Sequence, residues 1–233
     1  HDHKFDPISQ EEYYRFVAIF ERTIRGEVNL STRDTSGAGV LPVLVAGEGI
    51  KPLPRLYNPG PAFFTRTWFL RRGDVKLKDH EVRPGYLDVL LSAGVTRRDF
   101  AVPDDQPAVS GKDRPTLRRS GLARWMTDTR RGAGHLLARV IVNRIWQHHF
   151  GRGLVNTPND FGDQGQLPTH PELLDWLASE LIRSGWRLKS IHRLMLCSQT
   201  YRQAALASER TESDEALFRG RTVRRLEAES IRD

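Results

Sequence analysis

The sequence predicts a mainly α protein in which a C-terminal helical bundle follows a small, irregular α+β part. Two observations support this class. Apolar residues recur at helical spacing in successive stretches after residue 114, whereas the residues before it hold short apolar runs separated by glycine and proline. A polar segment with two prolines, residues 97–114, separates the two parts. We therefore expect a connecting part at residues 1–113 and a helical domain at residues 114–233.

The N-terminal part opens with a predicted helix at residues 9–25, because Ser9 and Glu12 have the spacing of a capping box. Residues 29–39 are rich in serine, threonine and glycine and predict a loop. Two strands are expected after it. The first is a short apolar strand at 41–45. The second, at 63–72, is rich in β-forming residues and is closed by a turn.

The C-terminal part contains five predicted helices, at residues 117–127, 134–150, 169–185, 188–201 and 213–233. The second has apolar residues on more than one face, which predicts a central position. Thr169 and Glu172 predict a capping box at the start of the third. We expect the bundle to pack around Trp146, with Trp125 and Trp176 also facing inward.

The chain has 233 residues and a net charge of +7, which is concentrated in one window. Residues 114–152 carry nine arginines and one acidic residue, Asp128. Such a window could meet phosphates, an anionic polysaccharide or an acidic protein, or it could be a solvated helix face with internal ion pairs. A single cysteine, Cys197, excludes an internal disulfide framework, and no apolar run is long enough for a membrane span.

Two groups of residues are candidate sites. The first is His1 with His3, whose imidazoles could bind a divalent metal together with Asp2 or Asp6. The alternative is a flexible N-terminal segment with no site.

The second group lies at the end of helix 134–150 and in the polar loop 153–168 that follows. We expect the loop to fold back on the helix, so that Arg144 pairs with Asp160 or Asp163. A purely structural ion pair is one interpretation. The other is a cleft in which His148, Asp160 and Asp163 carry out acid–base chemistry or bind a metal. No catalytic motif of known mechanism decides between them.

Several long runs resemble the planctomycete-type cytochrome-c-associated proteins of the PSCyt/PSD family. They are residues 138–155 (ARVIVNRIWQHHFGRGLV), residues 169–178 (THPELLDWLA) and residues 188–201. Residues 69–74 (FLRRGD) resemble the segment that precedes this domain in the family, and residues 1–8 (HDHKFDPI) resemble the end of the domain before that.

This resemblance implies an extracytoplasmic location, in the periplasm or cell envelope, and an upstream cytochrome-c-like domain of the same parent protein as a partner. It also implies haem c as a cofactor of the parent protein. His1 would be the histidine of a Cys-x-x-Cys-His haem-attachment motif, but this chain carries neither cysteine, so we expect no covalent haem on it. The family also implies an association with polysaccharide degradation and supplies no catalytic residues.

Three functions follow as hypotheses. The first is an extracytoplasmic module of a c-type-cytochrome-linked protein. The second is a redox-assisted, carbohydrate-active enzyme domain that uses the helix–loop candidates. The third is a nucleic-acid binder, which only the arginine-rich window favours, without a recognition motif or interleaved aromatic residues.

Overall fold

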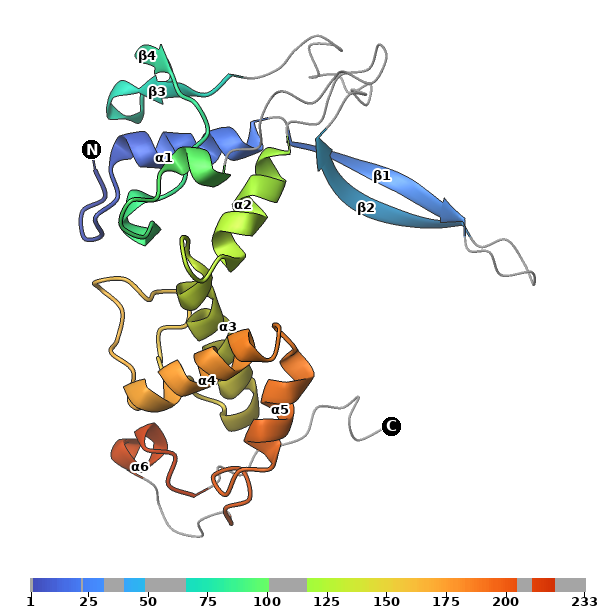
Figure 1. Ribbon diagram of the computed structural model, residues 1–233, viewed down its shortest axis with the longest axis vertical. Helices are drawn as coiled ribbons and strands as arrows, with labels where there is room; N and C mark the ends of the chain where they lie inside the picture. The colour runs from blue at the N-terminus through green and yellow to red at the C-terminus, as the bar shows by residue number, and fades with distance from the viewer. Residues whose placement is uncertain are drawn as a thin grey trace. The chain divides into compact units, whose positions relative to one another are not determined.

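The computed structural model describes residues 2–21, 23–31, 40–48, 66–100, 117–204 and 211–220 (Figure 1). The chain divides into two compact units, His1–Gly132 and Ala133–Asp233. Six α-helices and two small antiparallel sheets lie in the described residues, which confirms the mainly α class. Within these residues, every helix is too short or too polar to cross a membrane.

The first unit begins with helix α1 (Gln10–Val17), and its predicted capping box is confirmed. The Glu12 N–H donates to Ser9 Oγ at 3.2 Å, and the Ser9 N–H donates to Glu12 Oε2 at 2.9 Å. The helix is shorter than expected. It ends in a 3₁₀ turn, η1 (Ala18–Phe20), and strand β1 begins at Thr23.

Strand β1 (Thr23–Ser31) pairs antiparallel with β2 (Val40–Glu48), in a register that runs from Thr23↔Glu48 to Ser31↔Val40. The predicted strand at 41–45 is therefore confirmed. The extension of the first helix to residue 25 and the loop assigned to residues 29–31 are wrong. Apolar and polar residues alternate from Ile24 to Ser31, which is the period of a strand, and pairing with a distant segment satisfies its backbone.

The second sheet joins β3 (Trp68–Leu70) to β4 (Lys78–Glu81). It confirms the central part of the strand expected at 63–72, whereas residues 63–65 lie outside the described residues. The chain leaves β3 in the 3₁₀ turn η2 (Arg71–Gly73), where Arg72 has φ 56°, so the predicted closing turn is also present. Two further 3₁₀ turns follow, η3 (Asp88–Leu90) and η4 (Arg97–Phe100).

Helix α2 (Arg118–Thr127) packs in the first unit, against η1 and η4, although the sequence placed it with the C-terminal helices. Its Trp125 is 3% exposed and stacks on Tyr86, with ring centroids 5.6 Å apart. The edge of Phe16 also meets the Trp125 ring. Trp125 is thus buried as predicted, but in the core of the first unit.

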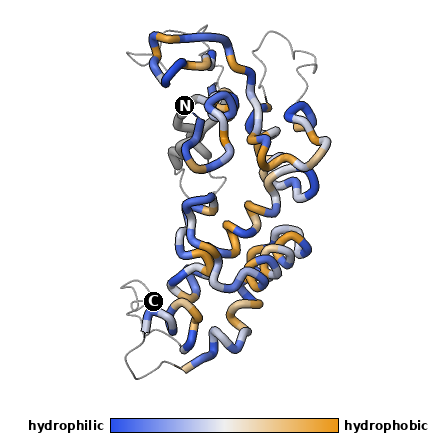
Figure 2. Tube along the Cα trace, turned by 90° about the vertical axis from the view of Figure 1, so that its left-hand side faces the viewer, coloured by the Kyte–Doolittle hydropathy of each residue, from blue (hydrophilic) through white to orange (hydrophobic). Residues whose placement is uncertain are grey.

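The second unit is built from α3 (Gly134–Phe150), α4 (Pro171–Arg183), α5 (Leu188–Leu196) and the short α6 (Glu212–Ala216). Helix α3 has the bounds that its sequence predicts, and Gly151 ends it with φ 88°. Helices α3, α4 and α5 pack against one another. These helices carry both hydrophobic and hydrophilic residues, as helices that bury only one face do (Figure 2). Of the last predicted helix, residues 221–233 lie outside the described residues.

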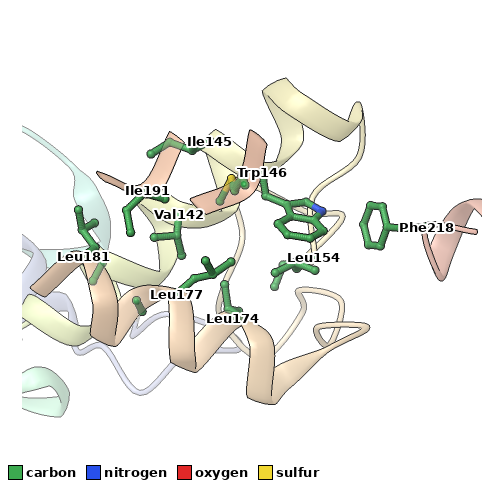
Figure 3. Packing of buried hydrophobic residues seen from close by; sticks show 13 residues of the cluster. Val142, Ile145, Trp146, Leu154, Leu174, Leu177, Leu181, Ile191 and Phe218 are labelled. Carbon is green, nitrogen blue, oxygen red and sulfur yellow. The ribbon is translucent and has the colours of Figure 1, made fainter. Parts of the chain in front are cut away.

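The core of this unit lies between α3, α4 and α5 (Figure 3). Trp146 is 4% exposed, and it stacks on Phe150 with ring centroids 4.1 Å apart. Phe218, which follows α6, meets the Trp146 ring edge-on at 5.2 Å. The prediction for Trp146 is confirmed, but Trp176 is 49% exposed. The buried stripe of α4 contains Leu174, Leu177, Ala178 and Leu181, and Trp176 falls on the other side of the helix.

The start of α4 differs from the prediction. His170 is the N-cap residue, and no side chain caps the helix, although Pro171 occupies the first position. Thr169 is used elsewhere, because both its N–H, at 2.9 Å, and its hydroxyl, at 3.3 Å, donate to the Leu154 carbonyl. These bonds hold the loop between α3 and α4 closed at its base.

Candidate functional site

The loop after α3 folds back on the helix, as predicted, but Asn143 is the residue that holds it. Asn143 is fully buried, and its amide makes two hydrogen bonds with one residue of the loop. Its Nδ2 donates to the Val155 carbonyl at 2.9 Å, and its Oδ1 accepts the Val155 N–H at 2.8 Å. Gly153 lies against this amide so closely that a Cβ there would fall 2.8 Å from Nδ2 and 2.4 Å from the Val155 oxygen.

The predicted ion pair of Arg144 with Asp160 or Asp163 is wrong. Arg144 is exposed, and its Nη2 donates to the side-chain oxygen of Asn159 at 2.8 Å. The Asp160 carboxylate instead accepts the Gly162 N–H at 3.0 Å, which closes a tight turn within the loop. The Asp160 carboxylate is therefore used within its own loop.

The described residues bring none of the other helix–loop candidates together in a common contact. His148 and Asp163 are both exposed, and no hydrogen bond or ion pair in this part of the chain joins His148 to Asp160 or Asp163. The acid–base interpretation of these residues gains no support from the geometry, and it stays a prediction.

The structure describes one of the two N-terminal histidine candidates, His3, but not His1. His1 lies outside the described residues, so its predicted roles in haem and metal binding stay predictions. His3 is held in a compact turn: its Nδ1 accepts the Asp6 N–H at 2.9 Å, and its own N–H donates to the Ile8 carbonyl at 2.8 Å. Asp2 accepts the Gln10 N–H at the first turn of α1. Hydrogen bonds therefore hold the segment from residue 2 near the start of the helix, and the Asp6 N–H already uses the lone pair of His3 Nδ1.

A different pair of histidines meets between α3 and α5. His149 Nε2 lies 2.8 Å from His192 Nδ1, which is a hydrogen bond whose donor depends on the tautomers of the two rings. The ring planes are nearly perpendicular, at 77°, with centroids 5.0 Å apart. Both residues are partly buried. We refer to His149 and His192 as the histidine pair.

An aromatic side chain fixes the orientation of the histidine pair. The Tyr201 ring meets His149 edge-on at 5.8 Å and also meets Phe150 at 5.9 Å. Phe150 in turn stacks on the buried Trp146, so the pair is anchored to the core of the unit. Burial lowers the pKa of His149, and the imidazoles of His192 and His148 lower it further.

The lowered pKa favours a neutral imidazole at His149, which can share a proton or offer a nitrogen lone pair to a metal. In the part of the chain that the structure describes, no three or more histidine, cysteine, aspartate or glutamate side chains converge on one point. A site here would thus use the two histidine nitrogens and complete its coordination with water.

His148, the candidate expected from the sequence, and its neighbour His149 lie on different sides of α3, and helical periodicity distinguishes them. His149 follows Val142, Ile145 and Trp146 at positions i+7, i+4 and i+3, which puts it on the buried side of α3. His148 follows Arg144 at i+4 on the exposed side. The partner, His192, lies 43 residues further along the chain, and no local signal connects it to His149.

The comparisons with known proteins bear on the same part of the chain, since a family model described as PSD1, protein of unknown function (DUF1553), matches residues 118–233. Residues 118–233 are therefore similar to the PSD1 family. The PSD1 region thus begins with α2 and includes the histidine pair and the Asn143 bridge. The match supports the expected resemblance to a planctomycete-type domain of unknown function. It does not extend to the expected association with a cytochrome. No curated protein and no solved structure matches the chain significantly.

Proposed function

We propose that this chain is an extracytoplasmic module of a protein that also carries a c-type haem domain, against which the module packs. The proposal rests on the PSD1 match of residues 118–233 and on the resemblance of residues 1–8 to the end of a domain that precedes it in the PSCyt/PSD family. In this proposal, helices α3, α4 and α5 of the second unit are the rigid body of the module. Anionic polysaccharide is a further ligand that the arginine-rich window could meet.

The observation that carries the proposal is the attachment of the N-terminal segment. The Asp2 side chain accepts the Gln10 N–H at 2.9 Å, and the His3 backbone N–H donates to the Ile8 carbonyl, so hydrogen bonds hold the segment from residue 2 at the start of α1. A haem domain joined directly to this segment would be held against the first unit, with little freedom to move on a linker. Such a fixed junction is what a module needs if it positions a haem domain for a partner.

The test uses the parent protein from its source organism. An antibody raised against this chain should detect, in the extracytoplasmic fraction, a protein larger than 26.6 kDa that also stains for covalent haem on a denaturing gel. A haem-free protein, or one confined to the cytoplasmic fraction, would overturn the proposal.

The rigid junction has its own test in that parent protein. Asp2→Ala removes the acceptor for the Gln10 N–H, whereas Lys4→Ala, at an exposed position, leaves these bonds in place. Limited proteolysis should release the haem domain faster from the Asp2→Ala protein than from the Lys4→Ala protein. Equal rates would show that the segment is not what holds the two domains together.

A further inference from the structure

We propose that His149 and His192 form a binding site for a divalent transition-metal ion such as Zn²⁺. This inference is independent of the haem-linked role, since it uses only residues of α3 and α5. It goes beyond the sequence-based candidates, because neither residue belongs to them.

The first argument is the geometry of the two ring nitrogens. His149 Nε2 and His192 Nδ1 lie 2.8 Å apart and face each other across one hydrogen bond. A tetrahedral zinc ion with bonds of about 2.0–2.1 Å holds two nitrogens about 3.3 Å apart. For one ion to bind both nitrogens, they must separate by about half an ångström, and each ring must turn so that its lone pair points to the ion beside the line that joins the nitrogens.

The second argument is that the rings are held in place before any ion binds. The Tyr201 ring meets His149 edge-on, and α3 and α5 pack directly against each other. Side chains whose orientation is fixed by packing lose less entropy on binding than flexible surface histidines do. Helix α3 therefore provides one ligand and α5 the other, on two elements that already form part of one core.

The third argument concerns charge and ligand chemistry. His149 lies in the last turn of α3, where the helix dipole favours a positive charge. Imidazole nitrogen suits zinc, copper and nickel. Two protein ligands leave the remaining positions to water, so we expect an exchangeable ion with open coordination positions.

The test is a titration of the purified chain with Zn²⁺ in competition with a chromophoric chelator. His148→Ala is the matched control, because it removes the adjacent, exposed histidine. The wild-type and His148→Ala proteins should bind the same number of zinc ions, and His149→Ala and His192→Ala should each bind one fewer. Binding by other histidines is common to all four proteins and cancels in the comparison.

The same number of bound ions in all four proteins would overturn the proposal, as would an equal loss in the His148→Ala protein. Circular dichroism without metal identifies a variant that fails to fold. In that event, histidine ring resonances of the wild-type protein replace the variants. Zinc below one equivalent should shift the resonances of His149 and His192 and leave those of His148 unchanged, and the opposite pattern would refute the site.

Discussion

The Asn143 bridge should dominate the stability of the second unit. Asn143→Ala removes both hydrogen bonds to Val155, whose side chain and backbone lie in the core at 2% exposure. An unsatisfied buried donor or acceptor costs about 1–3 kcal/mol, so the N–H and carbonyl of Val155 together cost about 2–6 kcal/mol. Whole domains are stable by only about 5–15 kcal/mol, so this single change should remove a large share of that stability.

Urea unfolding followed by circular dichroism measures the effect, and hydrogen exchange of peptides from α3 assigns the transition to the second unit. With a denaturant slope of about 1–3 kcal/mol per molar, the midpoint should fall by about 0.7 M or more. Asn156→Ala, at an exposed position in the same loop, should change stability by less than about 0.5 kcal/mol. If the midpoint of Asn143→Ala falls no further than that of Asn156→Ala, the bridge does not hold the loop as argued.

Three further changes test other parts of the structure by thermal melting. Trp146→Ala should lower the free energy of unfolding by about 3–5 kcal/mol, because the indole is buried between Phe150 and the residues of α4 and α5. Trp176→Ala should cost much less, because Trp176 is half exposed. Comparable losses would contradict the core described above. Gly153→Ala should destabilise by about 1–3 kcal/mol, since its Cβ would fall 2.4 Å from a backbone oxygen, and an unchanged melting temperature would show that the loop can move aside. Burial alone would raise the pKa of Glu12. Hydrogen bonds from the Ser9 backbone, the Asp88 backbone and the Ser9 hydroxyl, together with the positive charge of Arg97, outweigh burial and lower this pKa. The folded state then binds fewer protons than the unfolded state, so the contribution of Glu12 is present above about pH 4.5 and is lost as the pH falls through the lower, folded value. Glu12→Gln should therefore cost stability at pH 7 and much less near pH 3, and an equal loss at both values would refute this account.

The helices of the second unit illustrate how far local pattern reaches. The bounds of α3 follow from its sequence, because a long apolar repeat ends at a glycine that can adopt φ 88°. The capping box of α1 is equally local, since Ser9 and Glu12 satisfy each other within one turn. Strand β1 was missed, although its alternation of apolar and polar residues is present, because serine, threonine and glycine nearby favoured a loop.

The candidate site shows where local pattern stops. The sequence correctly indicated that the loop returns to α3, but it assigned the contact to the charged Arg144. A charged side chain at an exposed position gains little from a carboxylate that water already solvates, and Asp160 bonds to its own loop instead. The amide of Asn143 is buried away from solvent, so its hydrogen-bond partners must come from the protein. The backbone of Val155 provides them.

By itself, the sequence determined the mainly α class, the position of α3 and the burial of Trp146. These depend on periodicity and composition, which any contiguous stretch of chain displays. Only the tertiary structure decided that α2 packs in the first unit, that Trp176 faces outward and that His149 meets His192. Those outcomes depend on which distant segments lie side by side, and contacts between residues 43 positions apart leave no trace in local spacing.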